Sequence, residues 1–108
     1  MAKAMKKKGE FITICLINQA WDGTNYKFRI GGKVAIRLDT ITEVSPLVER
    51  DVCMNRNEPI WRAVPTKMKI ASIMKSTGNG HGINGVSYEY YIDEDSYNRV
   101  VEALGITL

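Results

Sequence analysis

The sequence has few of the residues that metal sites, disulfide scaffolds and many active sites require. Its 108 residues include one histidine, two cysteines and three prolines. Cys15 and Cys53 are too few for a disulfide scaffold and lack metal-ligand spacing, so a reducing cytoplasm is the expected compartment. His81 has no second histidine and no paired-cysteine motif to complete a metal site. We therefore expect a protein that is not an enzyme and that uses no metal and no cofactor.

Long apolar runs are also missing from the sequence. No stretch approaches the ~20 apolar residues that span a bilayer, so no membrane association is expected. The basic start of the chain is followed by Gly9 and Glu10 rather than by an apolar segment, which argues against a signal peptide.

The positive charge of the chain is concentrated at its start. The formal net charge is +3, from 15 basic and 12 acidic residues, and four of the lysines lie within residues 1–8. The remaining 11 basic residues are matched by the 12 acidic ones. We expect residues 1–9 to be a disordered basic lead and residues 10–108 to be a single α+β domain. A duplex-DNA binder is disfavoured, because the domain itself has no overall basic character.

Most of the domain has the residue pattern of β-strands. Residues 11–17 are β-branched and aromatic, and residues 26–30 and 33–38 alternate between apolar and polar side chains. Turns are expected at Asp22-Gly23 and at Gly31-Gly32. Residues 40–44, 60–64, 68–74 and 86–92 are further strand candidates. Residues 46–59 are polar and are expected to form a long exposed connection, with Val52 and Met54 as possible anchors.

The C-terminal segment predicts a helix. Asp93 to Ser96 supply capping and acidic side chains at its start, and Gly105 stands where a left-handed stop belongs. Apolar residues follow at helical spacing: Tyr97, Val100, Val101 and Leu104. The expected fold class is α+β, an antiparallel β-meander of five to seven strands with one C-terminal helix packed on the sheet.

A glycine-rich segment at residues 76–85 is expected to be a loop. It contains four glycines in ten residues, and exposed backbone N–H groups in such loops bind phosphates. Asn79, His81 and Asn84 would supply side-chain hydrogen bonds to a base or a ribose. The alternative is a hairpin tip without a ligand.

Basic and aromatic residues are interleaved elsewhere in the chain. Lys27 and Arg29 share a strand face, and an arginine follows Trp61 directly. Planar cations bind phosphates and indoles stack on bases, although a solvated strand face and a packing role for Trp61 are the alternatives. The candidate ligand-binding residues are Trp21, Arg29, Lys33, Trp61, Arg62, Asn79, His81, Asn84 and Arg99.

Two segments carry a resemblance to known families. Residues 33–46 (KVAIRLDTITEVSP) and 90–104 (YYIDEDSYNRVVEAL) resemble small FlbD-like domains and, more loosely, phage anti-Thoeris and anti-CBASS sponge proteins. The second resemblance implies an anti-defence binder that sequesters a cyclic ADP-ribose or cyclic nucleotide immune signal. The first implies a regulatory interaction module that binds protein or nucleic acid, which is the alternative function. The extra segments 46–59 and 76–85 favour the binder, because binding sites are commonly built on loops.

The small size of the domain predicts where such a ligand binds. A chain of this length has little room for an internal pocket of the ~300 Å³ typical of ligand sites. We therefore expect the site for a small anionic nucleotide-type ligand to lie between subunits of a homo-oligomer, a dimer or a larger ring.

Overall fold

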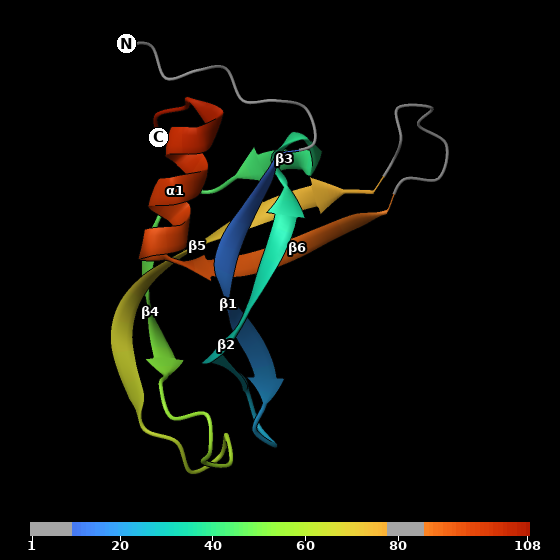
Figure 1. Ribbon diagram of the computed structural model, residues 1–108. Helices are drawn as coiled ribbons and strands as arrows, with labels where there is room; N and C mark the ends of the chain where they lie inside the picture. Colours follow the sequence, from blue (N-terminus) through green and yellow to red (C-terminus); the bar gives the residue numbers. More distant parts are fainter. Residues whose placement is uncertain (1–9, 78–85) are drawn as a thin grey trace.

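The computed structural model describes residues 10–77 and 86–108 (Figure 1). The predicted lead at residues 1–9 and the candidate residues Asn79, His81 and Asn84 lie outside these ranges. The described elements are β1 (Phe11–Trp21), β2 (Tyr26–Arg37), the 3-10 turn η1 (Leu38–Thr40), β3 (Ile41–Val44), β4 (Val48–Cys53), β5 (Pro65–Ser76), β6 (Ser87–Asp93) and α1 (Glu94–Leu104).

Five of these strands close into a barrel. β1 pairs with β2 and β6, β6 also pairs with β5, β5 with β4, and β4 with β2, while β3 adds a further strand along β5. The α+β class is confirmed, but the expected meander is wrong. Closure removes the exposed edges that a meander would leave, and it depends on pairings between distant segments, such as Leu16 with Ile92 and Phe28 with Val52.

The second strand is continuous where a tight turn was predicted. Gly31 and Gly32 lie inside β2, at the point where the register with β1 shifts across Leu16. A Cβ atom at Gly31 would lie 2.5 Å from the Asn18 Nδ2 atom and 3.1 Å from the Leu16 carbonyl oxygen. Glycine is therefore needed at Gly31 for a close approach of two strands rather than for a hairpin turn.

One strand lies in the segment that was predicted to be a connection. β4 occupies residues 48–53, and only Val52 and Cys53 of this strand are buried, so its sequence shows no apolar alternation. The strand predicted at residues 60–64 is wrong, because the N–H groups of Arg62 and Ala63 both donate to the Pro59 carbonyl in a turn.

Two apolar clusters stabilise the barrel from opposite faces of its strands. Adjacent residues of a strand point to opposite faces, and Ile70 and Ala71 of β5 belong to different clusters. One cluster packs under α1, with a buried set of Ile14, Ile36, Ala71, Ile73, Ile92, Tyr97 and Val100. The other takes side chains from each strand of the barrel: Ile17, Phe28, Ile30, Val52, Met68, Ile70 and Tyr91.

The C-terminal helix has the predicted limits and also protects a strand edge. The Asp93 carboxylate accepts the Ser96 N–H at 2.9 Å, and Gly105 ends the helix with a φ of 70°. Beyond the end of β6, the Ser96 hydroxyl accepts the Cys15 N–H of β1 at 2.8 Å. β6 pairs with β1 only at Leu16 and Ile17. The Ser96 side chain of α1 therefore hydrogen-bonds a backbone group of β1 that β6 does not reach. In the part of the chain that the structure describes, no helix is long and apolar enough to cross a membrane.

Candidate functional site

Four of the predicted ligand-binding residues lie at one end of the barrel. We call this the loop end; it consists of the β1–β2 turn at residues 21–26 and the β4–β5 loop at residues 54–64, at the bottom of Figure 1. Trp21 is 56% exposed and its ring meets that of Tyr26 edge to face at 5.0 Å. Trp61 is 64% exposed, so a packing role in the core is wrong for this residue, and the guanidinium of Arg62 lies 5.7 Å from its ring centroid.

Arg29 lies on β2 next to the loop end and is hydrogen-bonded within the protein. Its Nη2 atom donates to the Glu58 carbonyl, which attaches the β4–β5 loop to β2. Its Nε atom is buried and has no hydrogen-bond partner among the described residues. Arg29 therefore positions the loop rather than presenting a free guanidinium to a ligand.

The other predicted cations are not brought to the loop end. Lys33 is exposed on β2 opposite Cys15, in the half of the strand beyond the glycines. Arg99 on α1 donates to the Thr13 carbonyl at 3.0 Å and to the Ser96 hydroxyl at 3.2 Å. The structure thus separates the predicted set into a loop-end group and two residues on other parts of the barrel.

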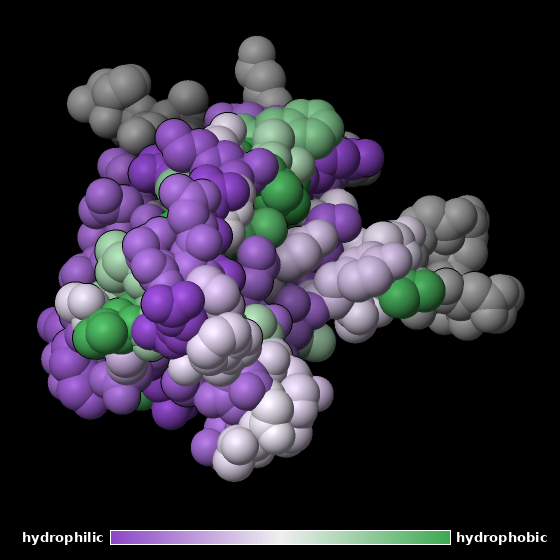
Figure 2. All heavy atoms as spheres, turned by 90° about the horizontal axis from the view of Figure 1, so that it is seen from below, coloured by the Kyte–Doolittle hydropathy of each residue, from purple (hydrophilic) through white to green (hydrophobic). Residues whose placement is uncertain are grey.

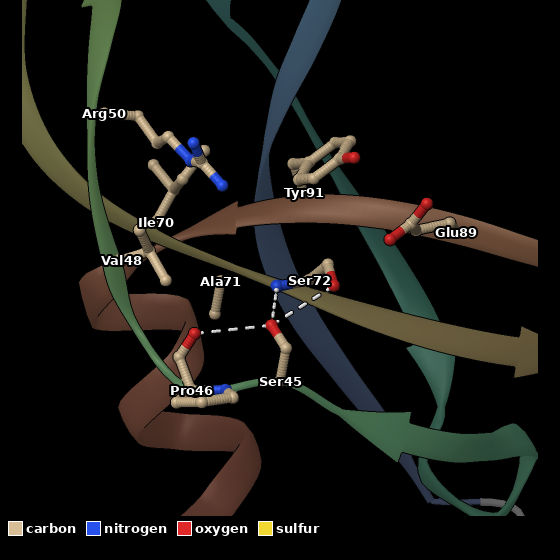
Figure 3. Close-up of a pocket in the computed structure, with 9 residues that line it drawn as sticks. All are labelled: Ser45, Pro46, Val48, Arg50, Ile70, Ala71, Ser72, Glu89 and Tyr91. Carbon is tan, nitrogen blue, oxygen red and sulfur yellow. Dashed lines mark hydrogen bonds between the residues drawn. The ribbon is translucent and has the colours of Figure 1, made fainter.

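An open pocket of about 260 Å³ lies where β3 ends and β4 begins (Figure 3). Pro46 cannot donate to β5, so the edge that β3 and β4 present to this strand is interrupted. Ser45 bridges the gap, because its N–H donates to the Ser72 carbonyl at 2.9 Å and its hydroxyl accepts the Ser72 N–H at 2.8 Å. The pocket is lined by Ser45, Pro46, Val48, Arg50, Ile70, Ala71, Ser72, Glu89 and Tyr91, and we call it the Arg50 pocket.

The side chains around this pocket combine a cation, an aromatic ring and a carboxylate. Arg50 comes from β4, and Glu89 and Tyr91 come from one face of β6, with Tyr91 directly opposite Ser72 of β5. Figure 3 shows the Arg50 guanidinium directed toward Tyr91, with Glu89 further along β6 on the same side as Tyr91. Neither Arg50 nor Glu89 has an ion-pair partner within residues 10–77 and 86–108. The arrangement suits a small ligand that carries both an anion and a hydrogen-bond donor.

A second pocket, of about 330 Å³, is also lined by Arg50. Its lining consists of Asn25, Tyr26, Lys27, Phe28, Arg50, Asp51, Cys53 and Pro65. Most charges here are neutralised within the protein, since Lys27 pairs with Asp22 at 3.3 Å and Asp51 pairs with Lys67 at 2.9 Å.

The hydrogen bonds and ion pairs beside this pocket shift the pKa values of Asp22 and Lys67. The backbone N–H groups of Asn25 and Thr24 lower the pKa of the Asp22 carboxyl, with a smaller contribution from Lys27. The hydrogen bond that the Lys67 ammonium donates to the Asp51 carboxylate raises the pKa of that ammonium. Arg50 is the lining cation that these pairs leave without a carboxylate among the described residues.

Sequence reasoning missed Arg50, Glu89 and Tyr91 as site residues. Arg50 lies in the polar segment that was predicted to be a connection, and the other two lie in a correctly predicted strand with no motif around them. The available signal was Ser45-Pro46 directly after a strand, a pair that interrupts a ladder and can open a pocket there.

Neither a metal site nor a known relative indicates the function of this chain. Among the described residues, no group of three or more His, Cys, Asp and Glu side chains is placed to hold a metal ion. Comparison with protein-family models, with curated proteins and with solved structures finds no match to this chain. The resemblances to FlbD-like domains and to sponge proteins therefore stay predictions, and the function must be inferred from the chain's own geometry.

Proposed function

We propose that this chain is a non-enzymatic binding protein that takes a small anionic nucleotide-type ligand in the Arg50 pocket. The observation that carries the proposal is an arginine without an ion-pair partner among the described residues, facing an aromatic ring in an open pocket. Sequestration of a cyclic ADP-ribose or cyclic nucleotide immune signal in a host cytoplasm is the specific role that we propose for it.

The lining of the pocket matches the parts of a nucleotide. A guanidinium fork binds phosphate through paired hydrogen bonds. The Tyr91 ring packs edge to face on Phe28 at 5.0 Å, and its pocket-lining part offers a surface for a base. Glu89 accepts hydrogen bonds from ribose hydroxyls or from an exocyclic amine. The hydroxyls of Ser45 and Ser72 complete a polar wall beside the apolar side chains of Val48 and Ile70.

The size of the pocket supports a site shared between two copies of the chain. Its 260 Å³ is below the ~300 Å³ at which typical ligand pockets begin. A cyclic dinucleotide would therefore extend beyond the pocket, and a second subunit could cover the rest. A homo-oligomer with its ligand at the subunit boundary follows from this proposal.

Calorimetry with cyclic ADP-ribose isomers and cyclic di- and trinucleotides tests the proposal. One of these ligands should bind, and Arg50→Ala should weaken its binding by ~1.5–3 kcal/mol, because a hydrogen bond to a charged group is lost. Arg37→Ala is the matched control, since Arg37 is an exposed arginine at the end of β2 and does not line the pocket. Absence of heat with every ligand, from a folded sample, would reject the proposal.

The ligand recovered after denaturation separates a binder from an enzyme. An unchanged ligand is expected, because we propose binding without chemistry. An altered ligand would show that the pocket catalyses a reaction.

The loop end favours the alternative of a regulatory interaction module. It exposes Trp21, Tyr26 and Trp61 together, which a pocket-binding function does not require. Recovery of a macromolecular partner without any small ligand would favour this alternative.

A further inference from the structure

The loop end exposes an unusual amount of aromatic surface. Both tryptophans of the chain lie there and are more than half exposed, as is Tyr26 at 66%. Large aromatic side chains are normally buried on folding, so an exposed group of them marks an interaction surface. Seen from this end, pale and green areas of intermediate and apolar hydropathy lie within a largely hydrophilic surface (Figure 2).

The charges at this end are mainly positive. The loop end contains Arg56 and Arg62 together with Asp22 and Glu58. Asp22 is neutralised by Lys27 at the start of β2, which leaves the two arginines against Glu58. The aromatic surface is therefore set in a positive field that attracts polyanions.

A polyanion with flat bases fits these features better than other occupants. Proteins that bind single strands combine cations along the backbone with aromatic rings on which bases stack. A second copy of this chain fits less well, because a two-fold interface would place the arginines of one copy against those of the other. An acidic peptide would satisfy the charge but would leave the exposed rings without flat partners.

We propose that the loop end binds single-stranded nucleic acid, with bases stacked on Trp21, Tyr26 and Trp61 and phosphates on Arg56 and Arg62. Arg62 lies over one face of the Trp61 indole at 5.7 Å. The indole is still 64% exposed, so it remains accessible to a base. This activity uses a surface separate from the Arg50 pocket and does not depend on the function proposed for that pocket.

Binding of fluorescein-labelled dT12 and rU12 to the full chain tests this proposal by anisotropy and by quenching of tryptophan emission. Saturable binding with quenching is expected, because the two tryptophans report directly on the loop end. Trp61→Ala should weaken binding by ~5- to 150-fold through loss of one stacked base. Arg56→Ala/Arg62→Ala should reduce the slope of log K against log salt by about 1.4, or ~0.7 for each phosphate contact.

The controls are Phe11→Ala and Arg37→Ala, an exposed ring and an exposed arginine far from the loop end. Both should bind as the unchanged chain does, and the basic lead is the same in all variants. Equal binding by all folded variants would overturn the proposal and assign the affinity to the lead. Stronger binding of a duplex, or quenching by an oligo-glutamate peptide without binding of either oligonucleotide, would overturn it in favour of another partner.

Discussion

At the scale of single residues, the candidate pocket depends on two adjacent residues between β3 and β4. Pro46 removes a donor to β5, and Ser45 replaces the missing strand pairing with its hydroxyl, which accepts the Ser72 N–H at 2.8 Å. The pocket exists because the chain is interrupted at Pro46 without separating from β5. The Ser45 hydroxyl therefore both stabilises the local backbone and lines the proposed site.

Ser45→Ala should destabilise the protein by about 1–3 kcal/mol. The substitution leaves the half-buried Ser72 N–H without its acceptor, and an unmade hydrogen bond costs its desolvation. Chemical denaturation measures the effect. Thr42→Ala is the control, since the Thr42 hydroxyl makes only a long, exposed bond of 3.4 Å to the Met74 carbonyl. Equal stability of the two variants would contradict this role of Ser45.

Residue-scale roles of arginine were the least predictable part of the candidate site. Arg29 and Arg99 have the composition and spacing of phosphate-binding cations, yet they donate to the carbonyls of Glu58 and Thr13. Both acceptors are backbone atoms far away in the sequence, and a backbone carbonyl carries no residue-specific signal. Arg50 acquires its possible role for the opposite reason, since folding leaves it without a carboxylate partner among the described residues.

At the scale of secondary-structure elements, the Gly31-Gly32 pair shows that two adjacent glycines can lie either in a turn or within a strand. Gly31-Gly32 has the composition of a hairpin turn, but β2 passes through it and approaches β1 closely at Asn18. Composition cannot separate these outcomes, because both require the absence of a side chain. β4 was missed for a related reason, since most of its side chains are exposed.

Gly31→Ala should destabilise the protein by about 1–3 kcal/mol. The added methyl group would lie within 3.1 Å of the Leu16 carbonyl and would displace the Asn18 side chain, and overpacking has a cost of this order. Gly32→Ala is a matched control, because no atom lies within 4 Å of its new Cβ atom. Thermal denaturation should show a lower midpoint for Gly31→Ala alone; a similar midpoint for both would refute the close approach.

At the scale of the whole molecule, barrel closure separates two possible binding surfaces. The Arg50 pocket lies between β3, β4, β5 and β6, whereas the aromatic surface lies on the turns at the loop end. Closure is completed by short pairings, Leu16 and Ile17 with β6 and Phe28 and Arg29 with β4. A small domain can thereby present a pocket and an exposed surface on one barrel.

The shared-site proposal predicts a homo-oligomer in solution. A pocket of 260 Å³ covers only part of a cyclic dinucleotide, so a dimer or a larger ring is expected. Light scattering of the intact protein, with and without a bound cyclic dinucleotide, measures the mass. A monomer that binds one ligand per chain would refute the shared site while leaving the Arg50 pocket intact.

The sequence by itself determined the mixed α+β class, the C-terminal helix with its caps, and most strand positions. These features depend on local periodicity and on capping residues such as Asp93 and Gly105. Only the tertiary structure decided the closed barrel, the exposure of Trp61 and of the predicted anchor Met54, and the Arg50 pocket. Each of these depends on pairing between segments far apart in the chain. The low number of histidines and cysteines predicts that the protein is not a metalloenzyme, whereas the position of Arg50 beside a pocket, without a carboxylate partner among the described residues, depends on folding.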